Sequence, residues 1–167
     1  MSSSYVDPTW VGGLATDALS SQYVFSHDDV RNPALLLKDA NTTTTGVGTY
    51  SVTTTGSTSK YIAISFPSYV HVSRVRLSPL LIDRWDANDL NGRTLQFSRD
   101  PCVSTSGVLL QTGWENFTTI ENITDSANLT EYVLNDTLAN TSMSCWRVFS
   151  SSGFVGLGSF MFDATCA

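Results

Sequence analysis

Short runs of β-branched and aromatic residues recur along the chain, between clusters of Gly, Ser, Thr, Asn and Asp. The clearest run is residues 61–66, where Ile62, Ile64 and Phe66 alternate with Tyr, Ala and Ser. This period of two predicts a strand that buries one face against a core. We expect Pro67 to end the strand, because proline cannot donate a hydrogen bond to a neighbouring strand.

A second run, residues 72–77, places Val75 and Leu77 on one face and arginines on the other. Val72 is out of phase with this pattern, so we expect a β-bulge or a strand start near Ser73. Further strands are expected at residues 23–25, 94–97, 108–110, 132–134, 145–149 and 159–162. Because helical periodicity is nearly absent, about eight short strands predict an all-β chain built as an antiparallel β-sandwich or jelly roll.

The stretch 41–59 consists almost entirely of Thr, Ser and Gly around a few apolar residues. Its composition is typical of a linker, but Tyr50 and Val52 alternate and Thr favours strands. We therefore expect an ordered loop that leads into a hairpin. The one helical candidate is a turn at residues 32–37, where Pro33 fits the first helical position.

Composition and charge argue against two classes of partner. The chain of 167 residues has a formal net charge of −6, and only 14% of its residues are charged. Nucleic-acid binding needs Lys and Arg concentrated on one face, whereas the arginines here are scattered, so we expect no nucleic-acid partner. The apolar runs are far shorter than the ~20 residues of a spanning helix, so we expect no membrane insertion.

The residues that catalysis needs are scarce. His27 stands beside two aspartates, where we expect a turn, and His71 lies between valines at a strand start. The three cysteines have no Cys-x-x-Cys spacing, which argues against zinc, and they allow at most one intramolecular disulfide. Because no nucleophile stands with a base and no metal cluster is visible, we expect the protein not to be an enzyme.

The chain contains Asn-x-Ser/Thr sequons, which in a secreted eukaryotic protein would be glycan acceptors on surface loops. They begin at Asn41, Asn116, Asn122, Asn128, Asn135 and Asn140. The first residues, however, lack the basic and apolar regions of a secretory signal. Either such a signal has been removed, or the protein is made in the cytoplasm and reaches its place of work inside an assembly. We therefore expect that these sequons arise by chance, because the chain is rich in Asn and Thr.

Six segments follow one another in an order shared with a known family. Residues 33–41 (PALLLKDAN) form an apolar turn before an Asp-Gly-Asn-like loop. YIAISF at 61–66 is similar to the family's strand motif W-x-x-I-D-L-G, and VSRVRL at 72–77 is similar to its next strand motif, V-x-x-V-R-I. The later motifs F-x-V-x-Y-S-x-D-G, a following tryptophan and V-R-I-Y are similar to residues 92–100, Trp114 and residues 146–149. In this order the segments resemble the discoidin, or coagulation factor 5/8 C-domain, group of the galactose-binding-like superfamily.

The resemblance implies a galactose-binding-like jelly-roll β-sandwich with about eight core strands over residues 33–167. Residues 1–32 are then an N-terminal extension or an extra strand. The resemblance also implies a structural calcium, with ligands from the early loop, here Asp39 and Thr44. No acidic residue lies within 155–162, where the family places its last carboxylate, so this set of oxygen ligands is incomplete.

The family's loops bind glycans, phospholipid head groups or protein partners, and one of these loops corresponds to residues 83–92. This segment combines an aromatic ring with planar polar groups, the mixture that sugar recognition needs. An equal alternative is that Trp85 packs on the sandwich edge while the acids form turns. Phe154 is a second aromatic platform or, alternatively, part of the core. The predicted ligand-binding residues are Arg84, Trp85, Asp86, Asn88, Trp114 and Phe154.

Together these observations predict a non-enzymatic binding or structural β-sandwich. We expect a virion surface or decoration protein, of a capsid or a tail, that binds host glycans. The alternative is a secreted glycan-binding adhesion module. Either function places the chain on a virion surface or outside the cell, with a glycan or a protein surface as its partner. We expect the chain to assemble into a homo-oligomer or into the lattice of a particle.

Overall fold

The computed structural model describes residues 22–25, 49–51, 60–81, 86–105, 110–126, 128–151, 153 and 155–167. Its strands are β1 (Gln22–Phe25), β2 (Thr49–Ser51), β3 (Lys60–Pro79), β4 (Thr94–Ser98), β5 (Trp114–Thr119), β6 (Thr130–Val133), β7 (Met143–Ser150) and β8 (Val155–Cys166). The helical elements in these ranges are a 3-10 turn, η2 (Ala87–Asp89), and a single turn of helix, α2 (Asp136–Ala139). Within the same ranges no helix is long and apolar enough to cross a membrane. The all-β prediction is confirmed.

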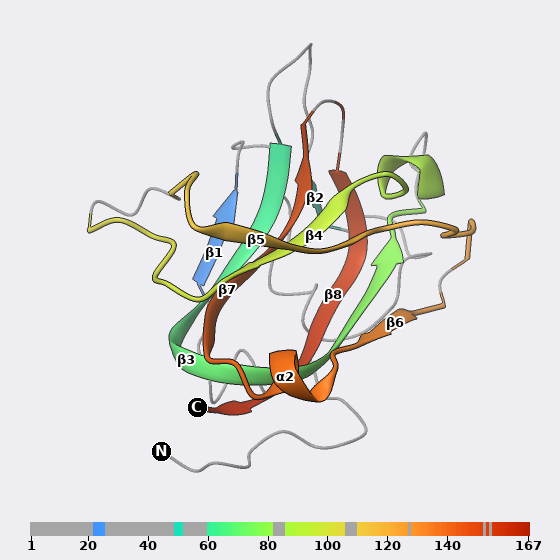
Figure 1. Cartoon of the computed structure of the whole chain (residues 1–167). Helices are drawn as coiled ribbons and strands as arrows, with labels where there is room; N and C mark the ends of the chain where they lie inside the picture. Colours follow the sequence, from blue (N-terminus) through green and yellow to red (C-terminus); the bar gives the residue numbers. More distant parts are fainter. Residues whose placement is uncertain are drawn as a thin grey trace.

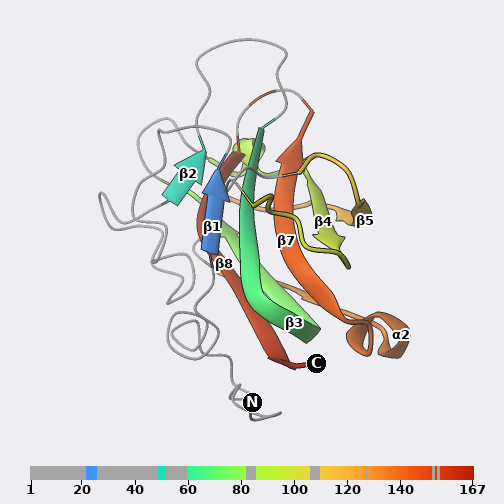
Figure 2. The same cartoon turned by 90° about the vertical axis from the view of Figure 1, so that its left-hand side faces the viewer.

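Strand β3 belongs to both layers of the sandwich. Its first half pairs with β1 and β7, and its second half pairs with β6 and β8. The first layer continues from β7 to β4 and β5, and the second continues from β8 to β2. Figure 2 shows β3 running the length of the molecule, with β1 on one side and β7 on the other. One continuous hydrogen-bonded path therefore folds over itself into the predicted antiparallel sandwich.

Pro67 does not end the strand, contrary to the sequence-based expectation. The pairing of β3 with β7 is interrupted between Ser65 and Val70, where the chain passes from one layer to the other. Proline is tolerated there because no partner strand needs its missing N–H. The bulge predicted in this strand is confirmed by a register shift between Val72 and Arg74 in the pairing with β8.

Most predicted strands correspond to observed ones, but β5 was not predicted. Its sequence, WENFTT, lacks a clear alternation, and the strand is only partly buried on both faces. Strand β2 lies within the Thr-rich stretch that was expected to lead into a hairpin. Of the strand predicted at 108–110, only Leu110 is described, and it lies in no strand. The turn predicted at 32–37 lies outside the described residues.

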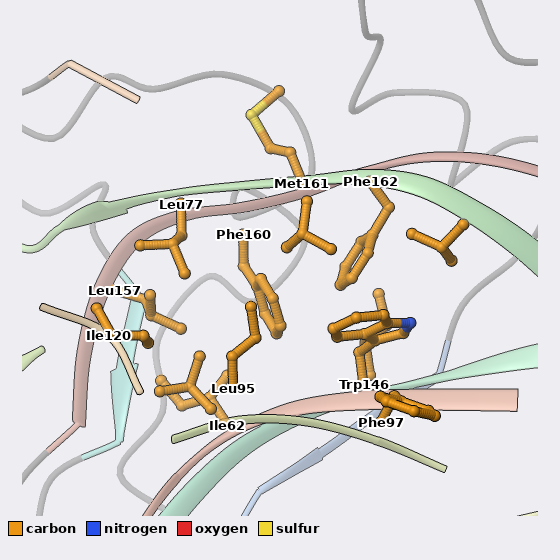
Figure 3. Close-up of a cluster of buried hydrophobic side chains, with 14 of the residues drawn as sticks. Ile62, Leu77, Leu95, Phe97, Ile120, Trp146, Leu157, Phe160, Met161 and Phe162 are labelled. Atoms are coloured by element: carbon orange, nitrogen blue, oxygen red, sulfur yellow. The ribbon is translucent and has the colours of Figure 1, made fainter. Parts of the chain in front are cut away.

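The main core fills the space between the layers. Phe97 and Trp146 from the first layer lie 5.4 Å apart between ring centroids, and Trp146 lies 6.0 Å from Phe162 of β8. Figure 3 shows these rings between the ribbons of the two layers. The predicted inward residues Ile62 and Leu77 are fully buried. Each fully buried Phe or Leu side chain contributes about 2 kcal/mol to folding.

A second, smaller apolar cluster lies on the outer face of the first layer. Cys102 and Cys145 form a disulfide, and Ala63 of β3 is buried against them. This pairing is the one disulfide that three cysteines allow, and Cys166 remains a free thiol. The segment that follows β4 is thereby held against β7, so this face of the sheet is covered rather than open to water.

Candidate functional site at the loop end

Three connections between strands meet at one end of the sandwich. They are residues 86–93, which contain η2, residues 120–125 after β5, and the β7–β8 turn at Gly153. We call these residues the loop end. Figure 1 shows the end of β7, the start of β8 and the green η2 coil toward the top of the molecule, with the C-terminus at the bottom. The loop end thus gathers segments that are far apart in the sequence.

The η2 turn is held by the carboxylates of its own sequence. The Asp86 side chain accepts a hydrogen bond from the Asn88 N–H at 2.8 Å, and the Asp89 side chain accepts one from the Asp86 N–H at 3.1 Å. This reciprocal pair is a capping box. The Ala87 N–H donates to Asp125 Oδ1 at 2.8 Å, from the β5–β6 connection. The acids of this segment form a turn, as the alternative interpretation expected.

Asn91 joins η2 to the β5–β6 connection. Its Oδ1 accepts from the Ile123 N–H at 2.8 Å, and its Nδ2 donates to the Ile123 carbonyl at 2.9 Å. The Gly92 N–H donates to the Ile120 carbonyl at 2.7 Å, and Gly92 has φ 82°, a conformation that favours glycine. These bonds fix the two segments relative to each other. The Asn-Gly pair is the sequence signal that marks such a turn.

Arg93 is the one positively charged residue described at the loop end. Its Nη1 donates to the Asn91 carbonyl at 3.0 Å. Burial lowers the pKa of Arg93, and the charge of Asp89 opposes that shift. A Cβ on Gly153, which has φ 90°, would lie 3.4 Å from Arg93 Nη2. The β7–β8 turn therefore approaches this guanidinium closely.

Asn88 differs from its neighbours because its side chain is not used by the turn. The residue is exposed, and only its backbone N–H takes part in a hydrogen bond within the described residues. A planar amide can donate and accept at once, as sugar hydroxyls require. Among the predicted ligand-binding residues that the structure describes, Asn88 is thus the one whose side-chain amide is available to a ligand.

The structure does not bring Trp114 to the loop end. Trp114 begins β5 opposite Ser98, whereas the other end of β5, at Thr119, pairs with Thr94. The length of β5 therefore separates Trp114 from η2. Its Nε1 donates to the Leu110 carbonyl at 2.8 Å, and its ring covers the guanidinium of Arg147 at 4.2 Å. The predicted ligand-binding set is divided between the two ends of the sheet.

Arg147 is a buried cation that the sequence did not single out. It is 3% exposed and lies 4.5 Å from the Phe149 ring centroid. Its Nε donates to Gln96 Oε1 at 2.7 Å. Burial lowers the pKa of Arg147 to about 10, and Tyr61 opposes that shift. Aromatic faces attract cations, so these contacts stabilise the sheet's outer face rather than present a charge to a ligand.

A pocket of about 150 Å³ lies on a different part of the molecule, lined by residues that include Phe66, Tyr69, Pro101 and Ser144. Ligand pockets usually measure roughly 300–1,000 Å³. This pocket is smaller, so the loop end remains the stronger candidate.

Several predicted site residues lie outside the described part of the chain. They are Arg84, Trp85, Phe154, Asp39 and Thr44. Within the described residues no group of three His, Cys, Asp or Glu side chains is arranged to hold a metal ion. The calcium site at Asp39 and Thr44 stays a prediction.

Several solved structures that are similar to this chain are sugar-binding domains. A fucose-binding module of Streptococcus pneumoniae matches 87% of this chain and 94% of its own, with a TM-score of 0.55 and 9% identity. The Clostridium perfringens domain CpGH89CBM32-5, solved with GalNAc-β-1,3-galactose, matches 92% of this chain and 99% of its own, with a TM-score of 0.55 and 12% identity.

The same fold also occurs in an enzyme. Allantoicase of Saccharomyces cerevisiae matches 86% of this chain and 39% of its own, with a TM-score of 0.52 and 9% identity. No protein-family model and no curated protein sequence matches the chain. At these identities the structural matches define the fold, which is the discoidin-like, galactose-binding-like β-sandwich.

Proposed function

We propose that the chain is a non-catalytic glycan-binding module whose ligand contacts the loop end. The observation that carries this proposal is the η2 turn, which is fixed by its own carboxylates and leaves the Asn88 amide exposed. Because function resides in sites rather than folds, the shared fold alone would not be sufficient. It supports the proposal because domains named for binding fucose or crystallised with Lewis b have this architecture.

The sequence adjoining the loop end supplies the other groups that a sugar site needs. Arg84 and Trp85 directly precede Asp86, and Phe154 directly follows Gly153. An aromatic ring covers the C–H face of a sugar, while amide and guanidinium groups bind its hydroxyls. We propose Trp85 as the aromatic platform, with Asn88 and Arg84 as the polar contacts.

The module would act on an exterior surface. The virion surface or decoration protein expected from the sequence is one such location, and a secreted adhesion module is the other. A purified virus or particle preparation that contains the protein would support the first location. Its presence in the medium of its source cells, without particles, would support the second.

A glycan array probed with the full chain tests the proposed function. Fucosylated and galactose-terminated glycans are the first to include, and a repeat in a calcium chelator tests the predicted calcium. We expect Trp85→Ala and Asn88→Ala to weaken binding at least tenfold. Asn88→Ala should do so at unchanged thermal stability, because the Asn88 side chain has no bond within the described fold. Val133→Ala, at an exposed side chain of β6, is the control and should bind normally. A blank array with folded protein would overturn the proposal.

A further inference from the structure

The asparagines of this chain are not distributed as chance would place them. The sequence has nine asparagines, and six of them begin an Asn-x-Ser/Thr sequon. Ser and Thr make up about a quarter of the residues, so random placement would give about two sequons. All five asparagines between residues 116 and 140 begin one. The enrichment lies in this segment.

Every one of those five asparagines is exposed. Asn116 lies on β5, Asn122 and Asn128 lie in the β5–β6 connection, and Asn135 and Asn140 cap the two ends of α2. Asparagine is usually exposed in folded proteins, and exposure is the condition that a glycan acceptor must meet. In Figure 1 the chain from β5 through β6 to α2 crosses the front of the molecule and descends its right side. The sequons therefore follow one continuous surface path.

The side-chain nitrogens of these residues are chemically available. The Asn116 and Asn135 side chains use their oxygens, which accept from Gln96 Nε2 and from the Leu138 N–H. Asn140 Nδ2 donates one hydrogen to the Asp136 carbonyl, which leaves its second hydrogen. No hydrogen bond of the Asn122 or Asn128 side chain occurs within the described residues. Replacing one Nδ2 hydrogen at each site would thus break no bond of the fold.

The disulfide is a second and independent observation. Cys102 and Cys145 are buried and joined, with Cα atoms 6.3 Å apart. Disulfides persist in oxidising compartments and are rare in the cytosol. In eukaryotic cells the oxidising lumen that forms disulfides is also where asparagines are glycosylated. The exposed sequons and the disulfide thus indicate the same compartment.

We propose that the chain is N-glycosylated along the path from β5 to α2. In each case a bond forms between Asn Nδ2 and the anomeric carbon of a diphosphate-activated oligosaccharide. The bond from that carbon to the diphosphate breaks, and Nδ2 loses one proton. This proposal concerns glycans carried by the chain and is independent of its ligand. It replaces the expectation that the sequons are accidental.

Glycans at these positions would have two physical consequences. Strand β5 ends the sheet path and pairs within the described residues with β4 alone, so its outer edge presents unpaired backbone groups. A glycan at Asn116 would block edge-to-edge pairing with another chain. Asn122 directly precedes Ile123, which is bonded to Asn91 of the loop end. A glycan at Asn122 would therefore stand within the loop end itself.

Peptide mass spectrometry of the native protein tests the proposal. Enzymatic release of N-glycans in heavy-oxygen water converts each occupied Asn into labelled Asp. We expect labelling at three or more of the five positions, while Asn88, which begins no sequon, stays unlabelled. Labelling at two or fewer would overturn the proposal. A ligand-binding failure on the glycan array would not affect this result, so the two proposals can fail separately.

A pair of threonine variants provides a structural control in cells that secrete the chain. Thr124→Ala removes the sequon of Asn122 but keeps the asparagine, whose φ of 59° a longer side chain would tolerate poorly. Thr119→Ala changes another exposed threonine that belongs to no sequon. We expect Thr124→Ala to migrate faster on a gel by one glycan and Thr119→Ala to migrate like the wild type. Equal migration of all three, with folded protein, would contradict a glycan at Asn122.

Discussion

The guanidinium carbon of Arg147 lies 4.2 Å from the ring centroid of Trp114, and the two residues belong to strands that do not pair with each other. Strand β4 lies between them, so the contact spans a whole strand on the outer face of the sheet. Gln96 of β4 accepts a hydrogen bond from Arg147 Nε at 2.7 Å. One tryptophan, one arginine and one glutamine thus connect β5, β4 and β7 by side chains as well as by the backbone.

This contact predicts that Arg147→Lys destabilises the protein by about 1–2 kcal/mol, although the charge is retained. A lysine lacks the planar guanidinium that stacks on Trp114 and binds Gln96 in a fixed direction. Urea unfolding measures the change. Arg99→Lys is the exposed counterpart, because water screens the two hydrogen bonds of Arg99 to Glu115 and its contact with the Phe97 ring, 5.9 Å away at the centroid, so the loss should be smaller. Equal effects of the two variants would contradict the stacking account.

The same contact explains where sequence reasoning reached its limit. The alternation at residues 61–66 predicted a buried face correctly, because that face depends on local period alone. Trp114 was predicted to bind a ligand, whereas it packs on Arg147, which lies far along the chain. No local pattern connects the two. Asp86 could not be assigned from sequence either, because a capping box and a ligand site use the same residue types.

The disulfide predicts a second, larger change in stability. Replacing both Cys102 and Cys145 by alanine should lower the free energy of unfolding by about 2–5 kcal/mol, because the bond closes a loop across 43 residues and constrains the unfolded chain. Calorimetry should show that a reducing agent lowers the melting temperature of the wild type but not that of the double variant. Cys166→Ala, at the free thiol, should leave the response to reductant unchanged. A double variant as stable as the wild type would show that the bond does not form.

Tyr132 predicts how stability depends on alkaline pH. Burial raises the pKa of Tyr132 above the usual 10.0, and the charge of Glu121 raises it further. The unfolded chain therefore loses this proton first, so stability is present below pH 10 and falls as the pH rises through the folded pKa. Tyr132→Phe should show a shallower loss than the wild type in urea unfolding measured from neutral pH to about pH 11. A loss of the same steepness in both proteins would contradict the shift.

Asn91 provides the test of whether the loop end is preorganised for binding. Asn91→Ala removes both hydrogen bonds to Ile123, which should cost about 1–2 kcal/mol and free η2 from the β5–β6 connection. Hydrogen exchange should then accelerate at residues 86–93 and 120–125 while the amides of β7 keep their protection. Asn88→Ala is the matched control, because its side chain holds no part of the turn and exchange should stay as in the wild type. If Asn91→Ala weakens glycan binding as well, rigidity of the turn contributes to affinity, since a mobile loop must be ordered on binding. Unchanged exchange in the Asn91 variant would show that these two bonds do not hold the site together.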